Sequence, residues 1–563
     1  MIGELPPALL FVIGALILPL VPRRWQSTWV VAVPVISLIN LIQIPIGVHW
    51  QVSVLDYELT FGRLDKLSFL FGLLFHIAAI IAGIFALHLR DPMQHIAALL
   101  YAGSAIGAVL AGDLVALFIF WEIMAVSSVF LIWARRTERA NRAGLRYLIV
   151  QIASGVILFA GIIVRVHETG STEFGLIGLD GLGGLLIFLA FGIKCAFPLL
   201  HTWLTDAYPE ATPTGTVFLS AFTTKVAVYC LARSYPGTEA LIYIGATMTM
   251  FPIFFAVIEN DLRRVLGYSM INQIGFMVVG IGLGTELALN GAVSHAFNDV
   301  VFKGLLFMSM GAVLHMTGRI DGTDLGGLYK TMPITATLCI VGAASISAFP
   351  LFSGFVSKSM VMASAAEEGH TIVFLALLFA SAGVFHHAGI KIPFFAFFAH
   401  DSGLRPGEPP INMLAAMVIA AVICVFNGSY PWLLYELLPW EAPYEPYTLT
   451  HVITQSQLLF YSALAFTLLM LSGLYPPEMR LLNLDIDWTW RRIATRMALG
   501  AGRAIDTAWR RITGFLKWRL DSIIADVYRH HGPRGVLART WPTGSTVLWV
   551  AVLLAVYLVI YFI

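Results

Sequence analysis

Six ionisable residues lie within long apolar stretches of this sequence, and their chemistry is the first clue to what the chain does. They are Glu122, Lys194, Lys225, His295, Lys303 and Lys358. Charged side chains are costly inside a bilayer, so each one is a functional hypothesis by default. A desolvated lysine beside a carboxylate can lose and regain a proton as the charge of its neighbour changes. One acid followed by a series of bases therefore predicts a pathway for protons.

The stretch HAFNDVVFKGLLF carries the densest part of this pattern. It places His295, Asp299 and Lys303 at steps of four, on one face of one helix. In a soluble protein this face would be an ordinary salt-bridged stripe. In a helix otherwise made of apolar residues it predicts a polar track through the membrane. Lys358, in SGFVSKSMV, is expected to be the last station, nearest to an exit.

Purely structural roles for the same residues stay open. Glu122 could be a neutral carboxyl group bonded to a backbone carbonyl. Lys194 and Lys225 could form permanent ion pairs that brace the fold. Lys358 could be a lysine near a helix end whose amine reaches the membrane interface.

Further polar residues accompany these positions. His201 and Asp206 follow GIKCAFPLL, in which proline is expected to break a helix just past Lys194. His386, His387 and Lys391 form another polar cluster with His400. Neighbouring histidines on a helix point apart, so metal binding by this cluster is not expected. With Asp299, these residues are additional candidates for the pathway.

The sequence contains none of the motifs that hold common cofactors. GxGxxG, Walker, CxxC and HExxH patterns are absent, so nucleotide, iron–sulfur and zinc chemistry have no support. The four cysteines lie inside apolar runs without paired spacing, which is typical of small buried residues. We therefore expect no cofactor and no catalytic motif, and whether the chain serves a redox-driven enzyme stays open.

Composition decides which elements must position these residues. The 563 residues are 58% hydrophobic and only 12% charged, about half the charge of a soluble protein. Apolar runs of about 20 residues recur along the chain, each long enough to span a bilayer as a helix. The first run, Leu9 to Val21, is interpreted as a spanning helix rather than a cleaved signal. The sequence predicts an all-α polytopic membrane protein.

Sixteen spanning segments are predicted. Their ranges are 5–22, 28–47, 66–88, 95–111, 113–134, 144–165, 181–208, 212–234, 239–258, 265–284, 291–316, 332–362, 371–399, 411–431, 457–476 and 543–563. Arg and Lys concentrate in the loops after odd-numbered segments, so the N-terminus is expected outside and those loops in the cytoplasm.

Two over-long segments share a short sequence. CAFPLLHTW around Pro198 resembles SAFPLFSGF around Pro350, and each has a lysine nearby. Broken helices at corresponding positions predict two inverted five-helix repeats, at residues 95–234 and 239–399. The remaining predicted parts are N-terminal helices at 1–94, further core helices at 411–476 and a last helix at 543–563.

Residues 485–539 differ from the rest, with eleven Lys or Arg against five Asp. Apolar residues recur there at steps of three and four, from Ile505 to Val527. This pattern predicts an amphipathic helix lying in the cytoplasmic membrane interface. Gly500 and Gly502 are places where it could bend. A basic linker before the last helix is the simpler alternative.

Several motifs together resemble a known family, the antiporter-like subunits of Mrp-type Na⁺/H⁺ antiporters and of the membrane arm of respiratory complex I. The matching pieces are FWEIMAVSS, GIKCAFPLLHTWLTDAYPEATPTG, TKVAVYCLAR, NDLRRVLGYSMINQIGF, HAFNDVVFKGLLF and FPLFSGFVSK. They occur in the family's order over residues 95–362. The resemblance implies a core of about fourteen helices with two inverted repeats, each containing a broken helix.

The resemblance also assigns roles to individual residues. It implies a Glu122–Lys194 pair, a central lysine at Lys225, a helix track through His295 and Lys303, and a terminal lysine at Lys358. Asp299 departs from the family, where a histidine or apolar residue is more usual. An acid there could strengthen a pair with Lys303 or bind a cation. The C-terminal helices resemble a shorter form of the lateral helix of L-type subunits, although Lys225 is typical of D, M and N types.

We therefore expect a D-like subunit of a monovalent cation/proton antiporter complex in the bacterial inner membrane. Its expected partners are other membrane subunits, protons, and Na⁺ or another monovalent cation. A proton-pumping subunit of a complex I-like or hydrogenase-linked complex is one alternative. An energy-coupling subunit for inorganic-carbon uptake is another, and a non-transporting scaffold is a third. The cation, stoichiometry and partner subunits are not determined by the sequence.

Overall fold

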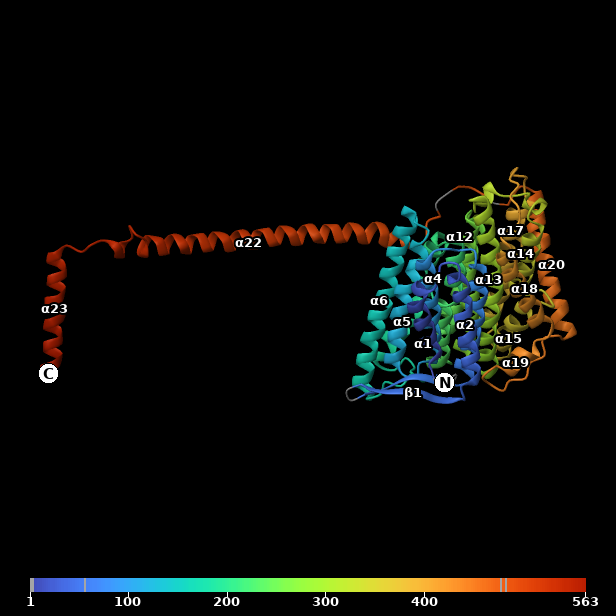
Figure 1. Cartoon of the computed structure of the whole chain (residues 1–563), viewed down its shortest axis with the longest axis horizontal. Helices are drawn as coiled ribbons and strands as arrows, with labels where there is room; N and C mark the ends of the chain where they lie inside the picture. Colours follow the sequence, from blue (N-terminus) through green and yellow to red (C-terminus); the bar gives the residue numbers. More distant parts are fainter. Residues whose placement is uncertain (1–4, 55–56, 476–477, 481–482) are drawn as a thin grey trace. The chain divides into compact units, whose positions relative to one another are not determined.

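A computed structural model describes residues 5–54, 57–475, 478–480 and 483–563 of the chain, which are almost entirely helical (Figure 1). In these residues, thirteen helices are long and apolar enough to cross a membrane. Three shorter apolar helices join them, at Pro7–Leu20, Gly181–Lys194 and Pro333–Ile346. Together they coincide with the sixteen predicted segments, so the all-α polytopic prediction is confirmed.

The chain divides into two compact units, Met1–Asn483 and Leu484–Ile563. The first unit begins with α1 (Pro7–Ile17), α2 (Gln26–Gln43) and α3 (Lys66–Phe85). It continues with α4 (Pro92–Leu110), α5 (Leu114–Trp133), α6 (Glu138–Thr169), α7 (Gly181–Lys194), α8 (Thr202–Ala207), α9 (Pro213–Ala221) and α10 (Thr223–Ser234).

A second run of helices follows. It consists of α11 (Glu239–Ile258), α12 (Leu262–Leu283), α13 (Glu286–Thr317), α14 (Pro333–Ile346), α15 (Ser353–Glu367) and α16 (Thr371–Val384). α16 continues through a π-helical turn, η5 (Phe385–Ile390), then α17 (Lys391–Pro393) and a second π-helical turn, η6 (Phe394–Phe398). α18 (Ile411–Ser429), α19 (Trp432–Glu436) and α20 (Leu449–Leu471) complete the unit.

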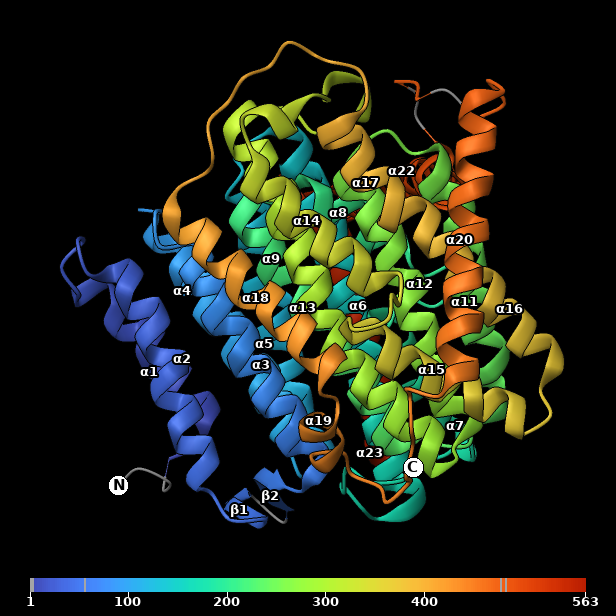
Figure 2. The same ribbon diagram turned by 90° about the vertical axis from the view of Figure 1, so that its right-hand side faces the viewer.

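A β-hairpin between α2 and α3 was not predicted from the sequence. Strands β1 (Gly47–Val54) and β2 (Tyr57–Leu64) pair in antiparallel register, with Gly47 opposite Leu64. Figure 2 shows the hairpin at one end of the helices of the first unit. The amide of Thr60 donates a 2.6 Å hydrogen bond to Asp113, and the amide of Gly112 donates to the Thr60 carbonyl at 2.9 Å. The hairpin therefore braces the loop that begins α5.

Two of the predicted spans are interrupted. α7 ends at Lys194 and is followed by α8 after a non-helical stretch, and α14 is separated from α15 in the same way. Within the first interruption Ala196 and Leu199 have φ of +62° and +71°, and within the second Ala348 and Leu351 have +60° and +72°. This conformation costs about 1–2 kcal/mol for a residue other than glycine. Such strain tends to gather at functional sites.

The helices on either side of residue 236 correspond in further respects. α6 and α13 have 32 residues each, and α7 and α14 have 14 each. α5 and α12 are both capped by an aspartate, Asp113 and Asp261, whose side chains accept from two backbone amides. These correspondences agree with the two-repeat organisation, which stays a prediction.

The first unit is built around α12, whose apolar window is entirely buried, as is that of the α9–α10 segment. α13 passes beside both of them. The ionisable residues of α10 and α13 therefore lie in the interior of a helical bundle, away from its outer surface.

The second unit contains α22 (Thr495–His531), preceded by α21 (Asp487–Thr489) and η7 (Trp490–Ala494), and then α23 (Thr543–Phe562). α22 is one helix of 37 residues that continues through Gly500 and Gly502. Its apolar stripe is exposed, with Trp509 at 65% and Leu516 at 59%. Exposed apolar stripes on basic helices are typical of membrane-interface helices, and that location stays a prediction.

Candidate functional site

A buried ion pair lies at the centre of the bundle. The amine of Lys225 on α10 is 2.7 Å from a carboxylate oxygen of Asp299 on α13, and neither side chain is exposed. The helix that carries Lys225 is interrupted at Phe222, between α9 and α10. The same amine donates to the Ser220 carbonyl at 3.2 Å, so the lysine satisfies a backbone group near this interruption. Asp299 was expected beside Lys303; its ion-pair partner is instead a residue of another helix.

His295 and Lys303 lie one turn of α13 on either side of Asp299, and both are fully buried. The amine of Lys303 donates to the Ser269 hydroxyl at 2.8 Å. One ring nitrogen of His295 is 3.1 Å from the Gln273 side-chain oxygen, and the other is 3.1 Å from the Ser357 hydroxyl. The predicted face of α13 is therefore hydrogen-bonded to α12 on one side and to α15 on the other.

Lys358 follows Ser357 on α15 and is 1% exposed. Its amine donates to the carbonyl of Ile346 at 3.0 Å and lies 5.0 Å from the ring centre of Phe276. Ile346 is the last residue of α14, so the lysine caps a helix end created by the interruption. The Lys358 amine therefore points into the protein and does not reach the membrane interface.

Lys194 and Glu122 occupy neighbouring places without touching. The amine of Lys194 donates to the Trp121 carbonyl at 2.8 Å and lies 4.2 Å from the centre of the Trp121 ring. Among the described residues no ion pair within 4 Å joins Lys194 to Glu122. One Glu122 oxygen is buried without a hydrogen-bond partner. The pair implied by the resemblance is thus separated in this conformation, and its two members still interact electrostatically.

The Glu122 carboxylate lies against Gly155 of α6. A Cβ at Gly155 would come within 1.4 Å of a Glu122 oxygen, which cannot occur without displacement of the carboxylate. Glycine is therefore required for the observed position of Glu122, although its backbone conformation is ordinary and helical.

If Glu122 belongs to the predicted proton pathway, Gly155→Ala should displace its carboxylate and slow proton movement while leaving the helix intact. Proton movement into vesicles and the melting temperature of the purified protein are the measurements. Gly304→Ala is the control, because nothing lies within 4 Å of a Cβ at that position in α13. Equal transport rates for the two variants would contradict the importance of the Glu122 position.

Asp206 and Glu210 form ion pairs with arginines of the first turns of α6. Arg146 contacts both oxygens of Asp206, at 2.7 and 3.0 Å. Arg139 lies 2.7 Å from a Glu210 oxygen. His201 is 3% exposed and packs against Phe251. The structure therefore separates Asp206 from the central pair and gives it a bracing contact.

The polar cluster of His386, His387 and Lys391 lies in η5 and α17, which continue α16. Lys391 donates to the carbonyls of Ala256, Val257 and Glu259 at 3.2, 2.6 and 2.7 Å. These carbonyls are at the C-terminal end of α11, where a cation is favoured. His387 is fully buried, and His386 is partly so. Within the described residues no group of three or more His, Cys, Asp or Glu is placed to hold a metal ion.

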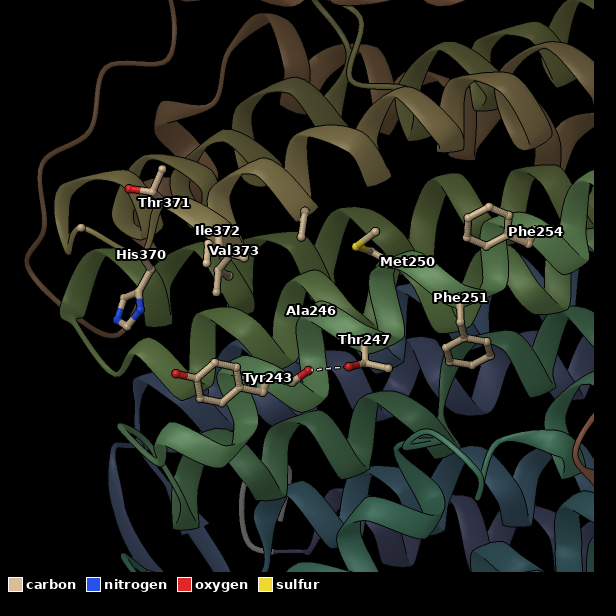
Figure 3. Close-up of a pocket in the computed structure, with 12 residues that line it drawn as sticks. Tyr243, Ala246, Thr247, Met250, Phe251, Phe254, His370, Thr371, Ile372 and Val373 are labelled. Carbon is tan, nitrogen blue, oxygen red and sulfur yellow. Dashed lines mark hydrogen bonds between the residues drawn. The ribbon is translucent and has the colours of Figure 1, made fainter.

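A separate groove of about 770 Å³ runs between α11 and α16 (Figure 3). Its walls are mostly apolar, and Thr247 donates its hydroxyl to the Tyr243 carbonyl at 2.8 Å. Its described lining includes none of the six residues of the predicted pathway, which are Glu122, Lys194, Lys225, His295, Lys303 and Lys358.

Sequence reasoning missed the neutral side chains that hold the charged ones. Ser269 and Gln273 are one turn apart on α12 and bind Lys303 and His295. Ser357 binds His295 from α15. Their signal was present as polar residues four apart in an apolar helix. This signal was weak, because serine and glutamine occur in membrane helices in many different roles and do not by themselves indicate a functional site.

Comparisons with known proteins identify chains that are similar to this one. Residues 111–385 match the family described as NADH:quinone oxidoreductase/Mrp antiporter, TM. A probable A/B subunit of a K⁺/H⁺ antiporter of Rhizobium meliloti is 32% identical over 417 residues, covering 68% of this chain and 42% of that protein. The D subunit of a Na⁺/H⁺ antiporter of Alkalihalophilus pseudofirmus is 31% identical over 291 residues, covering 48% and 59%. The chain thus spans about half the length of these relatives.

The fold is also found in a solved structure. A chain of the membrane-bound sulfane sulfur reductase, an archaeal respiratory membrane complex, superposes with a TM-score of 0.71 and 23% identity. The superposition covers 99% of this chain and 100% of that one. Through residues 111–385 the chain belongs to the NADH:quinone oxidoreductase/Mrp antiporter transmembrane family.

Proposed function

We propose that this chain is a proton-translocating membrane subunit of a multisubunit monovalent cation/proton antiporter, of the D type. The Lys225–Asp299 pair is the observation that carries the proposal, because both members are completely buried in the helical bundle. A buried ion pair is weak evidence for stability. Ionisable groups at such positions are more typical of ion pathways.

Protons would move along the line from Lys194 through Lys225 and Lys303 to Lys358. While Asp299 contacts Lys225, it stabilises the protonated amine of that lysine. Lys303 lies one turn away on the same helix, within reach of a rotated Asp299 carboxylate. Rotation of the Asp299 carboxylate toward Lys303 would stabilise a proton on Lys303 and allow Lys225 to release its own. His295, which is hydrogen-bonded to Ser357, would then connect Asp299 and Lys303 to Lys358.

Glu122 would control the first step of this sequence. Its charge acts on Lys194 without a direct contact, so a small approach of the two groups changes how strongly the lysine holds its proton. The separated arrangement would correspond to a state in which Lys194 can pass its proton onward.

The two relatives reported above are subunits of antiporters, and we propose that this chain likewise assembles with other membrane subunits in a bacterial inner membrane. Its N-terminus would be outside and α22 at the cytoplasmic surface, in keeping with the loop charges. The exposed apolar stripe of α22 would contact lipid or neighbouring subunits.

Transport by the purified complex is the direct test. The tagged complex would be placed in vesicles with a trapped pH-sensitive dye, and a gradient of Na⁺ or K⁺ would be imposed. We expect the cation gradient to drive protons the opposite way, and an uncoupler to abolish the signal. Failure of every monovalent cation to move protons would contradict the antiporter function.

A proton-pumping subunit of a redox-driven complex is the second candidate. The superposition on a chain of a respiratory complex extends through the C-terminal helices and favours this possibility. The same purification separates the two candidates, because a redox-driven complex would bring iron–sulfur subunits and pump protons on addition of a reductant.

A further inference from the structure

A cavity lies beside the extension of α16, on the same side as three loops that the charge pattern places in the cytoplasm. It has a volume of about 310 Å³ and is lined in part by Thr323, His400, Gly473 and Glu478. Glu478 is the carboxylate of this cavity, and one of its oxygens is 2.9 Å from the amine of Lys391. None of the groups proposed above for proton transfer is among the described residues that line this cavity.

Lys391 holds Glu478 in place as a fixed positive charge. Its amine contacts three carbonyls at the end of α11 in addition to the carboxylate, and it is completely buried. Four acceptors surround this amine, more than the two N–H groups of a neutral amine can serve, which favours the ammonium form. Lys391 is therefore a positioning residue, and the carboxylate that it holds is the group that can gain and lose a proton.

Protonatable groups lead inward from this carboxylate. Tyr475 is the next such group, and the centre of its ring lies 5.6 Å from that of His386. The Tyr475 hydroxyl, Nε2 of His386 and Nε2 of His387 are buried with no hydrogen-bond partner among the described residues. Buried polar atoms nearly always have a partner, and water serves where the protein does not. Several such atoms in sequence are the pattern of a hydrated passage.

The inner end of this series is close to the central axis. His387 lies in η5, which packs against α12, the helix whose Ser269 accepts a hydrogen bond from the Lys303 amine, and His387 and Lys303 are within electrostatic range of each other. Lys391 is within electrostatic range of both histidines, and Glu259 is within electrostatic range of Glu478. The π-helical turn at η5 matters here, because such turns rotate side chains relative to an α-helix and frequently occur at functional sites.

We propose that Glu478, Tyr475, His386 and His387 form a hydrated proton-access branch that connects the cavity at Glu478 to Lys303. It rests on the proposed proton transport and adds a route by which protons reach the middle of the axis. A proton from cavity water would bind the Glu478 carboxylate. It would then pass through water and the Tyr475 hydroxyl to His386 and His387, and finally to a neutral Lys303.

Glu478→Gln in the assembled complex is the principal test. Glutamine keeps a hydrogen-bond acceptor for Lys391 but cannot carry a proton, so the complex should assemble normally. Because positioned proton-transfer groups contribute about 10²–10⁴-fold, we expect transport to fall at least about tenfold. His387→Gln should act in the same direction. Glu368→Gln is the control, since Glu368 is an exposed carboxylate at the end of α15.

Cysteine labelling tests the hydrated cavity without any transport. Met470→Cys, which lines the cavity, should react with a membrane-impermeant thiosulfonate from one side of the membrane only. Leu464→Cys on the exposed apolar face of α20 should not react. The four native cysteines are buried, so the background is low.

The outcomes separate this inference from the proposed function. Wild-type transport in Glu478→Gln and His387→Gln, or no labelling at Met470→Cys, would overturn the branch. If the unmodified complex moves no protons, the proposed function fails, and the labelling result still decides whether the cavity is hydrated. Loss of assembly in Glu478→Gln would shift the decision to His387→Gln and the labelling.

Discussion

Replacement of Lys225 by methionine is expected to abolish proton transport and to destabilise the complex. The substitution leaves the Asp299 carboxylate buried without its ion-pair partner, which is 2.7 Å away in the intact protein. Breaking a buried pair by removing one member typically costs about 3–5 kcal/mol. Lys303, one turn away on α13, offsets part of this cost.

The double variant Lys225→Met with Asp299→Asn separates stability from transport. It removes both charges with little change in volume, so the melting temperature should return toward that of the wild type. Transport should stay abolished, because no group at this position can carry a proton. A purely bracing role for the pair predicts recovery of both properties.

Vesicle transport and thermal unfolding of the purified complex are the two measurements. The matched control is Lys330→Met with Asp401→Asn, another Lys–Asp pair at 2.6 Å, whose members are 42% and 41% exposed. Exposed pairs contribute about 0–1 kcal/mol, so this control should change neither property. Near-normal transport by the central double variant would refute the proposed relay through Lys225.

Glu122→Gln is expected to lose transport while the stability of the complex is unimpaired. Glutamine has nearly the shape of glutamate but lacks the charge that acts on Lys194. One buried Glu122 oxygen has no hydrogen-bond partner, and Lys194 keeps its bond to the Trp121 carbonyl, so the substitution leaves no buried charge without a partner. If the charge controls the first transfer, we expect a loss of at least about tenfold, or about 1.4 kcal/mol on the barrier.

Glu138→Gln is the control for this second prediction. Glu138 begins α6, and its side chain is 78% exposed beside Arg142. It should transport at the wild-type rate. Transport by Glu122→Gln within twofold of that control would show that the charge of Glu122 does not control the first step, whatever its effect on assembly.

Some features of the molecule follow from the chain's local chemistry and were predictable. Apolar runs of about 20 residues located all the spanning segments, because a bilayer demands that length of helix. Proline and a repeated FPL sequence located the two interruptions. The step of four between His295, Asp299 and Lys303 correctly placed these residues on one face of α13, because helix geometry is independent of tertiary context.

Other features required knowledge of which helices meet. Helical periodicity shows that His295, Asp299 and Lys303 share a face but cannot show what that face contacts. The packing of α10 against α13 decides that Asp299 pairs with Lys225 rather than with Lys303. The hairpin at β1 and β2 escaped prediction for a similar reason, since its short strands depend on contacts with the start of α5.

The identity of the charged residues inside the membrane was thus determined by the sequence, and their partners were decided by the tertiary structure. Lys194 bonds to the Trp121 carbonyl, Lys358 to the end of α14, and Lys391 to the end of α11. Each is a contact between residues of different helices. A buried ammonium ion can donate hydrogen bonds to carboxylates and to backbone carbonyls alike, so only the packing of the helices determines which of these groups it binds.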